Sequence, residues 1–155
     1  PEGWEYVEKT RAHAGDDPDI HIWQNLDDLE VAAFQKASRV VLQKSLREGF
    51  GMTVSEAMWK GRPVIGGYAG GIPLQVVDGE TGFLVESVEE CAEKMLYLLK
   101  NPEEAQRMGE AAREHVRRNF LITRQLGDYL QLFALLEHER AEATTGDTTW
   151  ERRLT

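Results

Sequence analysis

The stretch REGFGMTVSEAMWKG, residues 47–61, places Glu48 and Glu56 around a phenylalanine that has a glycine on each side. It follows a short β-branched run and continues into a predicted helix. Gly61 can cap the end of that helix, and Pro63 prevents it from continuing. A strand, a glycine-rich turn and a helix in this order are typical of a parallel sheet whose ligand-binding loops follow the carboxyl ends of its strands. This stretch therefore predicts an α/β fold.

The alternation of strands and helices continues on both sides of it. We expect strands at 20–24, 39–43, 63–66 and 81–85, and further helices that begin near residues 27, 87, 101 and 121. Asp27 and Glu30 have the spacing of a capping box. The helix that they begin is expected to turn its apolar residues toward a core: Val31, Ala32, Phe34 and Ala37.

This pattern predicts an α/β fold: a Rossmann-like parallel sheet with helices on both faces, closed by C-terminal helices. We expect residues 1–143 to form one domain and residues 144–155 to be a tail that could be disordered. The chain opens without Met on a stretch that reads like the end of a helical element, so we expect a fragment of a longer protein.

Composition narrows the classes of function. The 155 residues carry a net charge of −9 and no long run of Lys or Arg, so no nucleic-acid partner is expected. The apolar runs are too short for a membrane span, and a cytoplasmic location is expected. His13, His21, His115 and His138 are scattered and no Asp-x-Asp sequence occurs, so no metal site is expected.

The loop before the helix has the chemistry of an anion site. The first turn of a helix has unpaired N–H donors and a partial positive charge, which suit a phosphate. Gly49 and Gly51 allow a ligand to approach the backbone closely, and Lys44 could add a positive charge.

The two glutamates need a different ligand group, because a carboxylate beside a phosphate is unfavourable. An ionised carboxylate is an acceptor suited to hydroxyl groups. A nucleotide sugar carries both phosphates and hydroxyls and satisfies the loop as a whole. On spacing alone, an ordinary turn with surface acids remains the alternative for Glu48 and Glu56.

Four segments occur in an order that resembles a known family: EGFGMTVSE from Glu48, then AMWKGRPVIG, GGIP and DGETGFLV. They are similar to the C-terminal half of the retaining glycosyltransferases of family four, which have two Rossmann-like domains facing across a cleft. The resemblance covers roughly Asp19 to Phe120 and is greatest to the trehalose synthases and trehalose phosphorylases. Most members have Glu after G-G-x-P, where this chain has Leu74 followed by Gln75.

The resemblance implies the donor-binding half of a hexosyltransferase. It would transfer glucose from a nucleoside-diphosphate glucose to a sugar acceptor, with free glucose as the acceptor that gives trehalose. The Arg and Lys that clamp the diphosphate in the family would lie in a missing upstream part, so the isolated chain is expected to be inactive. The resemblance implies no cofactor and no metal, and it leaves a homodimer of the full-length protein open.

The resemblance also implies roles for individual residues. Glu56 would accept hydrogen bonds from the ribose 2′ and 3′ hydroxyls, and Glu48, the candidate catalytic residue, would hold hydroxyls of the transferred sugar. The remaining candidates would surround the sugar and phosphate (the amides of Phe50, Gly51 and Met52 with the Thr53 hydroxyl, beside Gly49 and Lys44), border the base (Gln24 and Asn25) or line the cleft (Gly70 and Gly71).

Two other functions remain open at this point. A sugar-nucleotide epimerase of the same architecture would release nucleoside diphosphate without needing an acceptor sugar. A non-catalytic sensor of nucleotide sugars would lack the upstream diphosphate-clamping cations.

Overall fold

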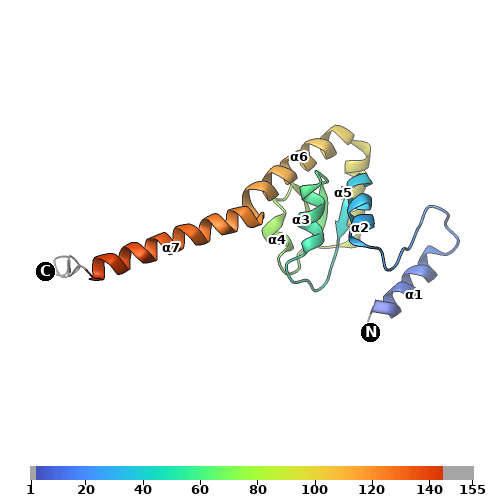
Figure 1. Cartoon of the computed structure of the whole chain (residues 1–155). Coiled ribbons are helices and arrows are strands. Elements are labelled where there is room, and N and C mark those ends of the chain that lie inside the picture. The colour runs from blue at the N-terminus through green and yellow to red at the C-terminus, as the bar shows by residue number, and fades with distance from the viewer. Residues whose placement is uncertain (1–2, 145–155) are drawn as a thin grey trace. The chain divides into compact units, whose positions relative to one another are not determined.

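The computed structural model of the chain describes residues 3–144 (Figure 1). These residues belong to two compact units that divide between Ala33 and Phe34. The first unit contains α1 (Gly3–Ala14) and the beginning of α2 (Asp28–Ala37). The tail predicted at 144–155 lies outside the described residues, except that Thr144 is the last residue of α7 (Ile122–Thr144).

The second unit is built on a parallel sheet of three strands, β1 (Val41–Gln43), β2 (Val64–Gly67) and β3 (Gly82–Val85). The strand order is β1-β2-β3, and Val64 lies beside Val41 on one side and Gly82 on the other. Successive parallel strands need crossover connections, which the intervening helices supply. The predicted α/β class is confirmed.

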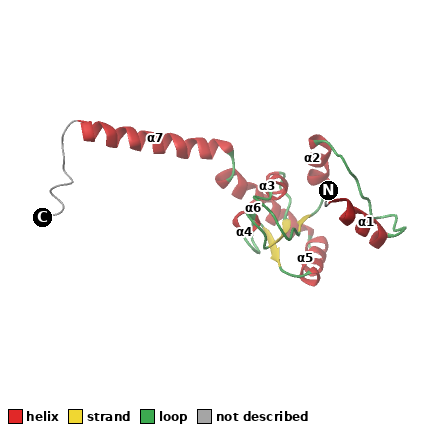
Figure 2. Ribbon diagram, turned by 90° about the horizontal axis from the view of Figure 1, so that it is seen from below, coloured by secondary structure: helices red, strands yellow, loops and turns green. Residues whose placement is uncertain are grey.

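Helices cover both faces of this sheet. Neighbouring side chains of β2 point to opposite faces, and each face is covered by its own helices. Val64 packs in one apolar cluster with α3 (Met52–Trp59) and α4 (Ile72–Gln75), and Ile65 packs in another with α5 (Val88–Lys100). Figure 2 shows the strands between these two sets of helices. α6 (Pro102–Asn119) contributes side chains to both clusters.

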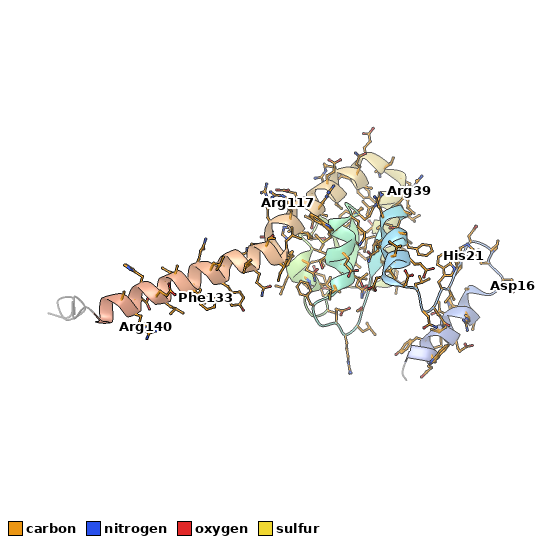
Figure 3. The ribbon with its side chains drawn as sticks, viewed as in Figure 1. Asp16, His21, Arg39, Arg117, Phe133 and Arg140 are labelled. Atoms are coloured by element: carbon orange, nitrogen blue, oxygen red, sulfur yellow. The ribbon has the colours of Figure 1, made fainter. Side chains whose placement is uncertain are left out.

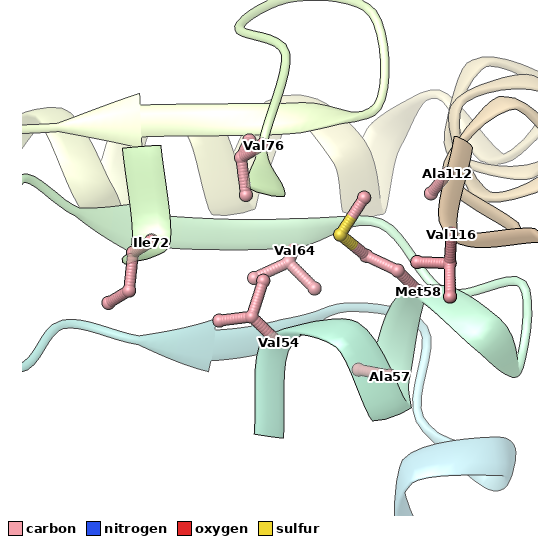
Figure 4. Close-up of a cluster of buried hydrophobic side chains, with 8 residues drawn as sticks. All are labelled: Val54, Ala57, Met58, Val64, Ile72, Val76, Ala112 and Val116. Atoms are coloured by element: carbon pink, nitrogen blue, oxygen red, sulfur yellow. The ribbon is translucent and has the colours of Figure 1, made fainter. Parts of the chain in front are cut away.

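The first cluster fixes α3 on the sheet and so fixes the loop that precedes it (Figure 4). Val54 and Met58 of α3 are fully buried against Val64. They are one helical turn apart and therefore share a face. The other buried members of this cluster are Ala57, Ile72, Val76, Ala112 and Val116.

The strand predicted at 20–24 is wrong. Residues 20–24 have no regular secondary structure, and Ile20 and Trp23 are about half exposed. The alternation of apolar and polar side chains was real, but a strand exists only when its backbone groups pair with a neighbour. In this segment His21 and Trp23 instead stack on each other, with ring centroids 5.4 Å apart.

The predicted capping box at the start of α2 is confirmed, but the buried face of that helix is not the predicted one. The Asp27 amide donates to the Glu30 carboxylate at 2.9 Å, and the Glu30 amide donates to Asp27 at 2.8 Å. Of the predicted core residues, Phe34 is 43% exposed and Ala37 is exposed, while Val31 and Ala32 are half-buried. Gln35 is the buried residue of this helix. Its polar contacts, described below, explain why the apolar spacing misled.

Within residues 3–144, none of the helices combines the length and the hydrophobicity that crossing a bilayer requires.

Candidate functional site

The loop between β1 and α3 ends in a left-handed glycine. Gly51 has a φ of 83° and occupies the N-cap of α3, where no side chain caps the first turn. The first bonded amide of the helix is that of Val54, which donates to the Gly51 carbonyl at 2.9 Å. Among the described residues, the amides of Met52 and Thr53 have no acceptor. The start of α3 therefore offers free donors with the positive end of the helix dipole behind them.

The loop after β2 packs directly on this first loop. The amide of Gly71 donates to the Gly49 carbonyl at 2.7 Å. A Cβ on Gly70 would lie 2.1 Å from the Glu48 carbonyl oxygen, and Gly70 also has a positive φ of 52°. A Cβ on Gly71 would lie 2.7 Å from the Phe50 carbonyl oxygen. The structure thus brings the predicted residues Gly70 and Gly71 against the backbone of the candidate loop, where only glycine fits.

Gln75, the last residue of α4, also holds the loop before α3. Its side chain is fully buried, and its amide nitrogen donates to the Phe50 carbonyl and, at 3.4 Å each, to the carbonyls of Gly51 and Gly71. Its carbonyl oxygen, Oε1, is buried and has no partner within the described chain. One buried amide therefore joins the two loops through their backbone oxygens.

Glu48 is held in place by its own neighbours. Its Oε2 accepts from Gln43 Nε2 at 2.9 Å and from Ser45 Oγ at 3.2 Å, and its Oε1 accepts from the Gly49 amide at 3.0 Å. Gln43 is the last residue of β1, so the end of the strand positions the carboxylate. The side chain is half-buried and keeps free lone pairs for hydroxyl groups.

Glu56 has a separate set of partners. Its Oε2 accepts from Gln35 Nε2 at 3.2 Å, and Gln35 Oε1 accepts from Lys60 Nζ at 2.7 Å. Both neighbours lie within the second unit, on α2 and at the end of α3. The two glutamates are therefore positioned independently, one by the end of β1 and one by α2.

The side chains of two predicted residues, Lys44 and Phe50, already have partners in the structure. Lys44 directs its ammonium group to the carbonyl of Glu86, just after β3, at 3.0 Å. Phe50 is 46% exposed, and its ring lies against that of Phe120 with centroids 5.9 Å apart. Lys44 is thus already engaged at the carboxyl edge of the sheet, while Phe50 is partly exposed and packs on Phe120.

Gln24 and Asn25, predicted beside the base, belong to the first unit. Asn25 has a positive φ of 55°, which Asn tolerates better than most residues. Their predicted role stays a prediction.

Four side chains that position the loop and its two glutamates were not among the residues predicted for the site: Gln35, Gln43, Ser45 and Gln75. Gln43 and Ser45 stand five and three residues before Glu48, so their polarity at a strand end was an available signal. Gln35 and Gln75 are buried by tertiary packing, which their neighbours along the chain do not indicate, although Gln75 stands where the motif departs from the family pattern. No group of three or more potential metal ligands occurs in the described part of the chain.

Comparison with known proteins places this geometry in a family. The family model described as "Glycosyl transferases group 1" matches residues 2–115. The trehalose synthase of Pyrococcus horikoshii is 56% identical over 135 residues, a match that covers 85% of this chain and 32% of that protein. The chain therefore spans about a third of the length of this curated relative.

Solved structures agree with the fold. Sucrose-phosphate synthase from Thermosynechococcus elongatus superposes with a TM-score of 0.73 at 30% identity, over 84% of this chain and 34% of that one. HepE of Anabaena, solved in complex with UDP-glucose, superposes with a TM-score of 0.70 at 20% identity, over 84% and 36% of the two chains. At that identity the second likeness concerns the fold alone. On the family match and the shared fold, the chain belongs to the group 1 glycosyltransferases, as its motifs indicate.

Proposed function

We propose that this chain is the donor-binding part of a retaining glycosyltransferase that moves glucose from a nucleoside-diphosphate glucose to a sugar acceptor. Free glucose is the proposed acceptor, and trehalose the product. The proposal is supported by family membership and by the trehalose synthase that is 56% identical to the chain. It is also consistent with the nucleotide sugar named for HepE, a protein of similar fold.

One observation carries the proposal. The start of α3 has two amides without acceptors, and the glutamates before and after them in the sequence are each held by other side chains. The amides of Met52 and Thr53 lack acceptors within the described structure, and their dipole favours a pyrophosphate. Glu48 and Glu56 are already oriented by other side chains, so they can meet sugar hydroxyls without being reordered. A ligand that has both phosphates and hydroxyls uses both features.

The chemistry that follows is charge stabilisation on the departing diphosphate. When the bond between glucose and phosphate breaks, negative charge grows on the phosphate oxygen, and fixed N–H donors stabilise that charge without rearrangement. Glu48 would orient the glucose by its hydroxyls, and Glu56 would hold the ribose. Gly49, Gly70 and Gly71 would leave room for the ligand and for the close contact between the two loops.

The acceptor side of the reaction is proposed to come from the rest of the protein. The curated relative is about three times as long as the matched segment, so the chain alone is expected to bind donor and to transfer nothing.

Calorimetry with the 155-residue chain tests this function. UDP, ADP and GDP and their glucose derivatives are titrated at up to millimolar concentration, and at least one pair is expected to bind. Glu56→Gln is expected to weaken that binding about tenfold, the effect of removing a charge-assisted hydrogen bond. Glu93→Gln, a change at an exposed glutamate of α5, serves as the matched control and should bind as the wild type does.

The absence of binding for every nucleotide would reject the proposal. So would equal binding by the wild type, Glu56→Gln and Glu48→Gln, because the carboxylates would then have no part in holding the donor.

A further inference from the structure

A second hollow lies at the other end of the sheet from the candidate donor loop. A cavity of about 390 Å³ is lined by residues that precede β1 and β2 and by residues of α5 and α6. Figure 3 labels Arg39, which stands just after α2 and before β1. Arg39 and Arg62 line the cavity before the strands begin, whereas the donor loop follows the strand ends.

The lining of this cavity is cationic in a chain whose net charge is −9. Arg39, Lys60 and Arg62 supply positive charge, and Glu110 is the carboxylate among the lining residues. Apolar side chains such as Leu98 and Pro63 complete the wall. Three positive side chains and one negative side chain leave a net charge of two positive units, which matches that of a dianion.

The arginines of this cavity lack counter-ions. Neither Arg39 nor Arg62 forms an ion pair with a described residue, although Glu110 lines the same cavity. In the same part of the chain, most other arginines pair with a neighbouring acid, as Arg107 does with Glu104 at 2.6 Å. The two guanidinium groups are therefore available to a ligand.

Arg62 gives an independent sign of a missing acceptor. Its Nε is buried and has no hydrogen-bond partner among the described residues. A buried donor without an acceptor is unfavourable and rare in native proteins, and a bound ion or ligand is one of its ordinary causes. A guanidinium group matches the geometry of phosphate or carboxylate oxygens through paired N–H donors.

We propose that the cavity lined by Arg39, Lys60 and Arg62 binds the phosphoryl group of a small phosphorylated molecule. A phosphate dianion balances the excess positive charge, whereas a single carboxylate would leave part of it uncompensated. The volume suits a small metabolite, since ligand pockets of proteins begin at about 300 Å³. Lys60 Nζ already donates to Gln35 and contributes as a nearby charge, so the two arginines make the direct contacts.

This site stands apart from the proposed donor site and does not rest on it. The two are read out at different residues: Gly61 and Arg62 for the cavity, and Met52 and Thr53 for the start of α3. A failure of one proposal therefore leaves the other testable.

Amide NMR of the ¹⁵N-labelled chain during a titration with inorganic phosphate tests the cavity. Shifts at Gly61, Arg62 and Gln106 are expected to saturate, and sodium chloride at matched ionic strength should not reproduce them. Arg39→Gln and Arg62→Gln should each weaken this binding about tenfold. Lys36→Gln, which removes an exposed positive charge on α2 outside the lining, should leave it unchanged.

Arg39 is exposed, so its substitution leaves the fold intact and decides the matter even if Arg62→Gln fails to fold. Shifts that grow linearly with ionic strength, or saturable shifts that Arg39→Gln leaves at wild-type affinity, would overturn the proposal. Shifts confined to Met52 and Thr53 would also overturn it, and would favour the donor site alone.

Discussion

The backbone amide of Gly71 donates a 2.7 Å hydrogen bond to the carbonyl oxygen of Gly49. These residues belong to loops that follow different strands, β1 and β2, so the bond joins the two loops at the carboxyl edge of the sheet. The candidate donor site is therefore a paired structure, and its shape depends on how closely the two backbones approach.

Gly70→Ala is expected to destabilise the protein and to displace the donor loop. The new Cβ would meet the Glu48 carbonyl at 2.1 Å, and the φ of 52° is strained for alanine. A loss of about 1–3 kcal/mol in the free energy of unfolding is expected from overpacking, measured by urea denaturation.

Gly49→Ala is the control for this change, because a Cβ there meets nothing within 4 Å and the residue has no positive φ. Its stability should stay close to wild type. Equal stabilities of the two variants would show that the loops do not constrain each other.

Gln75→Glu should destabilise the protein strongly at neutral pH. The side chain is fully buried among three carbonyl oxygens, and a carboxylate in that place would be an unpaired buried charge. The expected loss in the free energy of unfolding is about 3 kcal/mol, by analogy with buried charges that lose their partner. Burial favours the neutral acid, so the loss should fade below about pH 4, where the unfolded chain is protonated as well.

Gln75→Met separates charge from packing, because it keeps the length of the side chain and removes its polarity. It should lose less stability than Gln75→Glu at pH 7, with no comparable dependence on pH. Denaturation of both variants at pH 4 and pH 7 measures the difference. If Gln75→Glu lost as much stability at pH 4 as at pH 7, the buried-carboxylate argument would be contradicted.

Gln35→Met is expected to weaken nucleoside binding without weakening pyrophosphate binding. Gln35 orients the Glu56 carboxylate, and that carboxylate is proposed to hold ribose hydroxyls rather than phosphates. The affinity for a nucleoside diphosphate should fall several-fold, up to about tenfold, and that for inorganic pyrophosphate should not change.

Asn119→Leu is the matched control, because it removes a 2.9 Å bond from an exposed side-chain amide of α6 to the His115 carbonyl, away from the donor loop and outside the lining of the arginine cavity. Calorimetry with both ligands measures the effect. Equal weakening of the two ligands by Gln35→Met would indicate a general disturbance of α3 instead.

Ion pairs in the C-terminal half of α6 should stabilise the fold slightly, and this stabilisation should be lost in acid. Hydrogen bonds from Arg117 and then Arg118 lower the pKa of Glu114 from 4.5 to about 2. A lowered pKa means that the stabilisation is present above the unfolded value and is lost as the pH falls from about 4.5 toward 2. The effect should be modest and should shrink in high salt, because the pair is exposed to solvent.

Thermal unfolding of the wild type and Glu114→Gln across that pH range measures the contribution. The difference in Tm should close on acidification. A difference that stays constant from pH 5 to pH 2 would contradict the ion-pair argument.

The parts of the fold predicted best from the sequence depend on neighbours along the chain. The capping box of Asp27 and Glu30 and the helix stop at Gly61 follow from side chains and backbone angles within one turn, and both are observed. The strand at 20–24 failed because pairing with another strand is a long-range property. The turn before α3 lies where it was predicted, because the signal there is local: glycines stand directly before a helix.

The contacts that hold that loop were beyond local reasoning. Gln35 and Gln75 are buried by packing between segments more than 20 residues apart, and a polar residue on a helix looks exposed in the sequence. The engagement of Lys44 by Glu86 is equally non-local, since 42 residues separate them. Residue type predicted which groups could bind a ligand, but tertiary contacts determine which of them are already occupied.

A crystal structure of the chain soaked with the nucleoside-diphosphate glucose that binds best in calorimetry would show directly where the donor lies. We expect pyrophosphate oxygens at about 3 Å from the amide nitrogens of Met52 and Thr53, with glucose hydroxyls on Glu48 and ribose hydroxyls on Glu56. Density for the nucleotide away from the start of α3, with these amides and both carboxylates free of ligand, would contradict the proposed donor site.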